Sequence, residues 1–233
     1  TNLSGTIADA RLPTIPEAKL PTVPVAKGGT GLTSLGAAGK IIKVNSSGNA
    51  LEFGDAAGGM WKKLQTQTLG SDVGTVEFSN TYLTNTYTDF CIYISNLETA
   101  NETSLRTRVR KVGDSSFTTS NYEYGTRAFK SDGTTDHASS NSDDRHECTP
   151  NNLRAETAKP ASIRITYYNM FDTNSYVGFE VKGIYMNSSD QTCVLYSSGM
   201  LKDGAGDAFD RILIYGGSGN IKAGTKFELY GRE

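Results

Sequence analysis

The sequence lacks the residue and charge patterns that mark nucleic-acid-binding, membrane and secreted disulfide-rich proteins. Its 233 residues include two histidines, three cysteines and one tryptophan, and the formal net charge is −2. Charges of both signs are mixed along the chain, which gives no indication of a nucleic-acid or anionic-membrane partner. No apolar run is long enough to span a membrane, and no signal peptide is recognisable. We therefore expect neither binding of nucleic acid nor insertion into a membrane.

The three cysteines exclude a disulfide framework, because they are odd in number and far apart in the chain. Cys91 and Cys193 lie in strand-like runs, where we expect them to behave as small buried apolar residues. Cys148 lies in a stretch that reads as a polar loop. This pattern fits synthesis in a reducing cytosol.

Catalytic motifs are equally scarce. The two histidines lie in one stretch, so no Ser/His/Asp or Cys/His arrangement is predicted, and no glycine motif opens a helix to bind phosphate. Glycoside hydrolysis would need two carboxylates on a rigid scaffold. The candidate carboxylates are best explained by chance placement in polar turns, and they are Asp143, Asp144, Asp203, Asp207 and Asp210. We predict no catalytic residue, no cofactor and no enzyme.

A repeat stands out between residues 9 and 32, "DARLPTIPEAKLPTVPVAKGGTGL", where an Ala-Arg or Ala-Lys pair recurs every eight residues. Proline fixes φ, removes a donor and extends the preceding residue, so the segment is predicted to be stretched out. A single extended chain has no interior for apolar side chains. A disordered linker is the alternative, but such linkers seldom keep an aliphatic residue at a fixed period. We predict a wound homo-oligomeric shaft that buries Leu12, Ile15, Leu20, Val23 and Val25 between chains.

A short connector follows the repeat. Residues 40–44 and 50–53 are two strand-like runs around Asn45-Ser46-Ser47-Gly48-Asn49, which predicts a hairpin. Residues 54–59, "GDAAGG", offer no side chain that could anchor a core, so they are predicted to form a hinge before the next domain.

From residue 60 onward the sequence favours an all-β fold. Short strand-like runs are separated by Gly, Asn, Asp and Ser, and no long window shows a helical period. In "LRTRVRKV" Leu105, Thr107 and Val109 share one face, while three arginines form a basic stripe that we interpret as a solvated strand face or a subunit contact: Arg106, Arg108 and Arg110. The other runs are 90–95, 163–168, 176–186, 192–201, 209–215 and 226–230. They predict an antiparallel β-sandwich or jelly roll.

Several segments together resemble bacteriophage tail fibres, especially those of marine phages. The shaft end "LSGTIADARLP", "AKLPT" and "AKGGTGLTSLGAAGKIIKVNSSGNALEFGD" is similar to the repeat and joining module of such fibres, and "IKAGTKFELYGRE" is similar to the end of a fibre tip. The resemblance implies a homotrimer with a distal β-sandwich head that touches the bacterial host. It also implies a virion location and further tail proteins bound through a preceding part of a longer fibre.

The stretch 130–160 has the least strand character of the chain, so we predict a long loop there, and loops of this length are usually functional. It collects both histidines, several carboxylates and an arginine. Two tyrosines flank a nearby loop and offer aromatic faces for a glycan. The candidate receptor-binding residues are therefore Asp136, His137, Asp143, Asp144, Arg145, His146, Tyr122 and Tyr124.

A metal is an alternative use of the same stretch, since Glu147 and Cys148 add two further ligand types. No regular ligand spacing organises these residues, so we predict no metal site. The resulting domain prediction is a trimeric shaft at 1–36, a connector and hinge at 37–59, and a β-sandwich head at 60–233. The predicted function is reversible binding of a host-surface glycan or outer-membrane protein. A glycan-cleaving spike and a purely structural fibre or baseplate joint are the alternatives.

Overall fold

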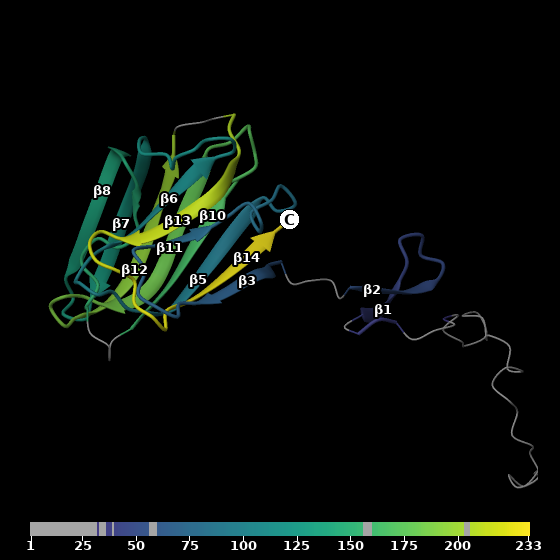
Figure 1. Cartoon of the computed structure of the whole chain (residues 1–233), viewed down its shortest axis with the longest axis horizontal. Coiled ribbons are helices and arrows are strands. Elements are labelled where there is room, and N and C mark those ends of the chain that lie inside the picture. The colour runs from purple at the N-terminus through teal and green to yellow at the C-terminus, as the bar shows by residue number, and fades with distance from the viewer. Residues whose placement is uncertain (1–31, 33–35, 39, 56–59, 156–159, 203–205) are drawn as a thin grey trace, which may run out of the picture. The chain divides into compact units, whose positions relative to one another are not determined.

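The computed structural model describes residues 32, 36–38, 40–55, 60–155, 160–202 and 206–233. The chain divides into two compact units, Thr1–Gly58 and Gly59–Glu233. The described residues of both units are all-β, as predicted, and include no helix that could span a bilayer (Figure 1). The predicted shaft contacts lie outside the described residues, and they are Leu12, Ile15, Leu20, Val23 and Val25.

The first unit contains the predicted hairpin. Strand β1 (Lys40–Val44) pairs antiparallel with β2 (Leu51–Asp55), and Val44 lies opposite Leu51. The Asn45 side chain accepts a hydrogen bond from the backbone N–H of Asn49 at 3.1 Å. This contact closes the turn, as an Asn at the start of a loop commonly does.

The second unit, called the head below, consists of two antiparallel sheets. In spatial order, the large sheet contains β3 (Lys62–Thr68), β14 (Lys226–Arg232), β5 (Asp89–Leu97), β10 (Ala161–Tyr168), β11 (Val177–Met186), β12 (Thr192–Leu201), β7 (Tyr122–Lys130) and β8 (Thr135–Asp143). The small sheet contains β4 (Thr75–Phe78), β13 (Phe209–Gly216), β6 (Leu105–Lys111) and β9 (His146–Glu147). The strand runs predicted from alternation correspond to β5, β6 and β10–β14.

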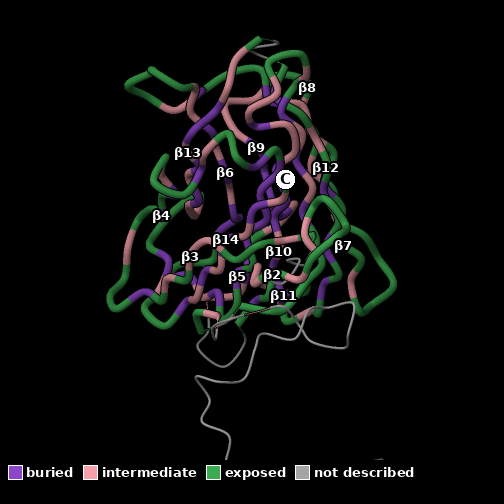
Figure 2. Tube along the Cα trace, turned by 90° about the vertical axis from the view of Figure 1, so that its right-hand side faces the viewer, coloured by how far each residue is buried: buried purple, intermediate pink, exposed green. Residues whose placement is uncertain are grey.

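The two sheets pack face to face and enclose the core. Phe78 on β4 contacts Phe227 on β14, with ring centroids 6.2 Å apart, and Thr107 on β6 lies 2.7 Å from the hydroxyl of Tyr167 on β10. Figure 2 shows the buried segments gathered in the interior of the head and the exposed ones around its periphery. The predicted sandwich is therefore confirmed in a form with sheets of unequal width, so that part of the large sheet extends beyond the small one.

Along β6, buried side chains alternate with partly exposed ones, so one face of the strand packs in the core and the other contacts solvent. Leu105, Thr107 and Val109 are buried, as predicted, while the intervening arginines stay partly exposed. Each fully buried aliphatic side chain contributes about 1.5 to 3 kcal/mol to the free energy of folding relative to an exposed one. The arginines are not a free basic stripe, because each makes a salt bridge, to Glu147, Asp144 and Asp210 respectively.

The prediction of a long loop at 130–160 was wrong, because this stretch contains β8 and β9. Strand β8 is the edge of the large sheet and has the sequence TDHASSNSD, which offers no large apolar side chain. Its residues alternate between exposed and half-buried, so neither face of it reaches the core. Backbone pairing with β7 forms the strand, and sequence alternation of apolar residues could not reveal it. Cys148, also expected in a loop, is fully buried.

Candidate functional site

The face of the large sheet that points away from the core is not covered by any described element of the head. Six exposed large apolar side chains lie on its strands β5, β7, β11 and β12, and they are Tyr93, Phe129, Ile184, Val194, Tyr196 and Met200. A monomeric protein rarely leaves so many apolar side chains together without a binding role. This outer face is therefore a candidate binding surface.

The strand register arranges the outer face into rows that run across the sheet. One row joins Lys182 on β11 to Tyr196 on β12, then to Arg127 on β7 and His137 on β8. Directly opposed residues have Cβ atoms about 4.5 to 5.5 Å apart, so neighbours in this row touch or nearly touch. We call these four residues the cationic row. It brings an aromatic ring, two cations and an imidazole into one line.

The next row along the strands is made of small side chains. Ser198 on β12 lies opposite Gly125 on β7, and Gly125 lies opposite Ser139 on β8. We call these three residues the floor. Beyond it, Met200 and Glu123 form the next opposed pair. Because small residues separate two rows of larger ones, the surface is hollowed there into a groove of about 840 Å³, which the floor and the cationic row both line.

The absence of a side chain at Gly125 matters for the depth of the groove. A Cβ atom built at this position would meet no atom of the protein within 4 Å, and the backbone there is not in the left-handed region. The strand therefore does not need glycine for steric or conformational reasons. A larger residue at position 125 would project into open space and fill the groove without disturbing the fold.

The charges in the groove are unequally compensated. Glu180 accepts a hydrogen bond from the Tyr168 hydroxyl at 2.6 Å. It also forms salt bridges with Lys182 and, at 3.8 Å, with Arg164. The hydrogen bonds from Lys182 and Tyr168 hold the pKa of Glu180 below its usual value, so it is ionised at neutral pH. Arg127 makes no salt bridge with any described residue. The groove consequently carries a positive charge that no carboxylate of the described residues offsets.

Of the predicted receptor-binding residues, His137 lies in this groove and is exposed. Its neighbour Asp136 points to the other side of β8, where it pairs with Lys130 at 3.1 Å and accepts a hydrogen bond from Asn151. Asp136 therefore contributes to fastening the edge of the sheet. The two residues were predicted to act together, and the alternation of β8 separates them.

Tyr122 and His146 cannot touch a receptor, because both are completely buried. The hydroxyl of Tyr122 accepts a hydrogen bond from the backbone N–H of Val109 at 2.9 Å, and His146 stacks on Phe179 with ring centroids 5.1 Å apart. Tyr124 is half-buried and lies 5.3 Å from the His146 ring. These three predicted site residues belong to the core and its margin, so they do not form part of the candidate site.

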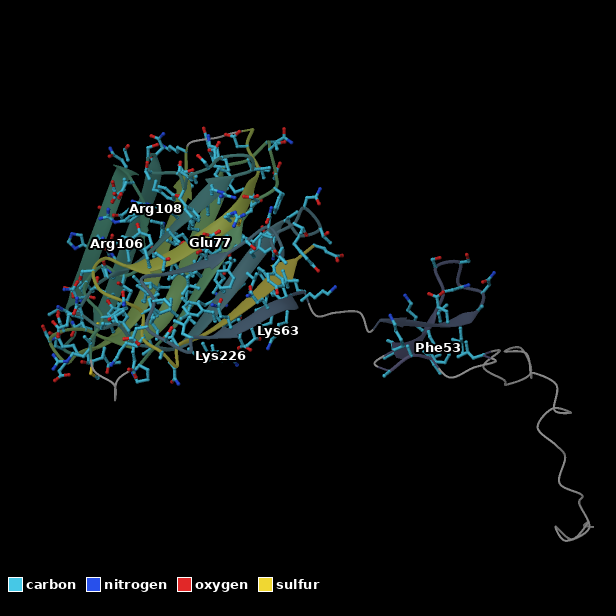
Figure 3. All side chains as sticks on the ribbon, viewed as in Figure 1. Phe53, Lys63, Glu77, Arg106, Arg108 and Lys226 are labelled. Atoms are coloured by element: carbon cyan, nitrogen blue, oxygen red, sulfur yellow. The ribbon has the colours of Figure 1, made fainter. Side chains whose placement is uncertain are left out.

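Asp143, Asp144 and Arg145 form an ion-pair network near the arginines of β6. Arg108 pairs with Asp144, and Arg145 pairs with Asp144 and Glu147, the latter at 3.0 Å. Arg106 and Arg108, both on β6 of the small sheet, are labelled in Figure 3. Because these charges already satisfy one another, the network fastens β9 and the residues before it to β6.

Asp143 is held in the ionised form within this network. Burial alone would raise its pKa, but hydrogen bonds from the Tyr124 hydroxyl, at 2.7 Å, and from the Asp144 backbone N–H keep the pKa below its usual value. The guanidinium of Arg145 also lies 3.6 Å from this carboxylate, so its negative charge is already matched within the network. Its role in the described structure is therefore structural.

No group of three or more His, Cys, Asp or Glu side chains that could hold a metal gathers among the described residues. The remaining carboxylates considered for hydrolysis are also paired: Asp207 lies 2.9 Å from Lys111, and Asp210 lies 3.6 Å from Arg110. Asp203 lies outside the described residues.

A Ser–His contact that the sequence did not predict joins Ser197 and His146 in the core. Both side chains are buried, and the second ring nitrogen of His146 has no hydrogen-bond partner, so no carboxylate orients the imidazole. A nucleophilic serine needs access to substrate and an oriented base. This pair has neither and cannot act as a catalytic dyad.

Sequence reasoning missed Arg127, Tyr196, Gly125, Ser139 and Ser198. A signal for part of the groove was present, because the run 192–201 alternates, with Val194, Tyr196 and Ser198 on the face opposite Leu195 and Ser197. Within this run, the outward-facing Tyr196 indicated that a large aromatic side chain lies on the exposed face of the sheet. The partner strand β8 was not predicted, so the row could not be completed from sequence.

Comparison of the chain with protein-family models, with curated proteins and with solved structures found no match. The sequence resemblance and the geometry of the groove are the observations that bear on function.

Proposed function

We propose that the chain is the tip of a bacteriophage tail fibre and that its head reversibly binds a glycan on the bacterial surface. The resemblance of the repeat and of the head to tail fibres supports the first part. The groove on the outer face supports the second, and it is the observation that carries the proposal. The protein would accordingly reside in the virion, where a preceding part of the fibre binds other tail proteins.

The chemistry of the groove suits a saccharide better than a protein surface. Sugar rings present a flat C–H face and a rim of hydroxyl groups, so they bind where an exposed aromatic ring adjoins hydrogen-bonding groups. Tyr196 supplies the aromatic face and is half exposed. Ser139, Ser198 and Glu180 line the same groove and offer hydroxyl and carboxylate oxygens. A recess with a few convergent polar groups is the usual form of a small-ligand site.

Binding without cleavage fits the carboxylates at the groove. A glycosidase needs a general acid with a raised pKa beside a second carboxylate. The pKa of Glu180 is lowered instead, and Glu123, on the far side of the floor, pairs with Lys202. Glu180 is therefore not suited to donate a proton at neutral pH.

A homotrimer is part of the same proposal, since the shaft repeat predicts a wound assembly of chains. Three heads on one fibre would multiply a weak affinity through effective concentration. Light scattering of the full chain tests this, with a mass of three chains expected. A monomer at micromolar concentration would contradict the trimeric arrangement and leave the groove proposal to its own test.

The groove is tested by filling it. Gly125→Phe places a ring in the open space above the floor, and we expect it to abolish labelling of susceptible bacterial cells by the fluorescent chain. Gly70→Phe is the matched control, because a Cβ at Gly70 also meets no atom within 4 Å and this exposed position lies outside the groove. Both variants should keep the melting temperature of the parent. Full labelling by a stable Gly125→Phe protein would refute the groove as the receptor site.

Two assays of the same purified chain distinguish the proposed function from the two alternatives. Release of oligosaccharides from host polysaccharide would indicate a glycan-cleaving spike. Binding to another virion protein without binding to any cell would indicate a structural joint.

A further inference from the structure

We propose that the groove selects an acidic saccharide, whose carboxylate or phosphate group binds the guanidinium of Arg127 while a sugar ring packs on Tyr196. This inference depends on the proposed glycan-binding function and narrows the class of its ligand. It rests on how the arginines of the head are paired.

Arg127 differs from every other arginine among the described residues. Each of the others lies within 4 Å of at least one carboxylate oxygen, and these paired residues are Arg106, Arg108, Arg110, Arg145, Arg154, Arg164, Arg211 and Arg232. Arg127 has no such carboxylate among the described residues, and it lies on β7, the strand next to the edge of the large sheet. An exposed arginine that has no carboxylate partner within the described structure is available to pair with an external anion.

The position of Arg127 makes it available to a ligand in the groove. Its direct neighbours across the strands are Tyr196 and His137, and neither carries negative charge. Its own side chain is exposed, and Gly125, two residues before it on the same face, leaves the approach open. The guanidinium therefore has an unobstructed side toward the floor.

The other charges of the groove do not supply a competing partner. Glu180 is the carboxylate that lines the same recess, and it is already bound to Lys182, Arg164 and Tyr168. Lys182 is likewise engaged with Glu180. An incoming anion would consequently meet Arg127 as the uncompensated charge, and the ring nitrogens of His137 lie next to it as further hydrogen-bonding groups.

The chemistry of guanidinium defines the ligand class. Its planar fork donates two parallel hydrogen bonds to a carboxylate or phosphate, whereas a neutral hydroxyl can use only one at a time. Uronic and other acid-bearing sugars combine such an anion with the C–H face that stacks on an aromatic ring. The juxtaposition of Arg127 with Tyr196 therefore matches a saccharide that carries both features.

The test uses the full chain on an array that presents neutral, carboxylate-bearing and phosphate-bearing oligosaccharides, with carboxyl-reduced versions of the second set. We expect binding to be confined to acidic saccharides and to be lost when the carboxyl group is reduced. Arg127→Gln should weaken binding about 10- to 100-fold, and Arg127→Lys should weaken it less, because a hydrogen bond to a charged group is worth more than a neutral one. Lys62→Gln removes one exposed positive charge outside the groove and should have no effect.

The outcomes separate this inference from the function on which it depends. Equal binding of an acidic saccharide and its reduced form, or unchanged binding by Arg127→Gln, would overturn the acidic selectivity while Gly125→Phe still abolished binding. Binding to no saccharide would overturn both proposals. A change of oligomeric mass in Arg127→Gln would mean that Arg127 faces a second copy of the chain, which would also overturn the inference. Carboxylate- and phosphate-bearing arms identify which anion is preferred.

Discussion

The Nε2 atom of His146 lies 2.9 Å from the Oγ atom of Ser197, inside the core of the head. The Ser197 hydroxyl is also 2.6 Å from that of Thr126, which donates to the backbone carbonyl of Glu147 at 2.8 Å. The imidazole is fully buried and has no carboxylate beside it, and burial lowers its pKa from 6.5 to about 3. This hydrogen-bonded chain links β9 of the small sheet to β7 and β12 of the large one.

The first prediction concerns the stability of the head below neutral pH. The unfolded chain binds a proton at His146 near pH 6.5, whereas the folded chain does so only near pH 3. The unfolded state therefore gains protons first, and the free energy of unfolding should fall as the pH drops from about 6.5 toward 3, by at most about 1.4 kcal/mol per pH unit from this group. Urea unfolding at pH 7, 6, 5 and 4 measures the slope.

Two variants identify the histidine responsible. His146→Gln should flatten the dependence, because glutamine does not titrate. His137→Gln removes the exposed histidine and should leave the slope of the parent. Equal slopes in all three proteins would contradict a role for the buried imidazole.

The second prediction concerns Tyr122. Removal of its hydroxyl in Tyr122→Phe leaves the buried N–H of Val109 without its acceptor, which should lower the free energy of unfolding by about 1 to 3 kcal/mol. Cell labelling should not change, since Tyr122 is buried. Tyr196→Phe is the control with an exposed ring, and it should leave stability unaltered. Identical urea midpoints for Tyr122→Phe and the parent would show that the hydrogen bond contributes nothing.

The third prediction concerns thiol reactivity. Cys91, Cys148 and Cys193 are free and buried, and burial raises the pKa of each thiol. Since the thiolate is the reactive form, we expect Ellman's reagent to label none of them in the native protein and all three in urea. Rapid labelling of one thiol under native conditions would reveal a local opening of the head.

The fourth prediction concerns the end of the chain. Asp89 accepts hydrogen bonds from the Asn169 backbone N–H and from Arg232 Nε, both at 2.9 Å, and is nearly buried. Asp89→Ala leaves both donors unpaired and should lower the free energy of unfolding by about 2 to 3 kcal/mol. Glu228→Ala breaks an exposed pair with Lys63 and should lower the Tm less. If the two variants melted together, Asp89 would not anchor β14.

The parts of the fold that could be predicted are those with an apolar face. The run 192–201 and the alternating β6 were found because leucine, valine and cysteine side chains repeat every second residue toward the core. Strand β8 could not be found in this way, because its polar residues pair with β7 through the backbone and meet no core.

The candidate site was predictable only in part for the same reason. His137 was selected for its residue type and does line the groove, but its neighbours Arg127 and Tyr196 reach it through the register of three strands. Register depends on long-range pairing that no local pattern of residues specifies. His146 shows the opposite error, since a polar neighbourhood in the sequence gave no sign that its side chain enters the core.

Along strands β7 and β12, side chains that face the core alternate with side chains that face outward. Positions such as Tyr122, Ala128 and Leu195 face the core and determine whether the head folds, whereas Gly125, Arg127 and Tyr196 face outward and contribute little to packing. Substitutions at the outward-facing positions should therefore have little effect on the packing of the core. If the head attaches to cells as proposed, substitutions in the floor could change the attachment specificity one residue at a time while the protein remained folded, so the specificity would change faster in evolution than the fold.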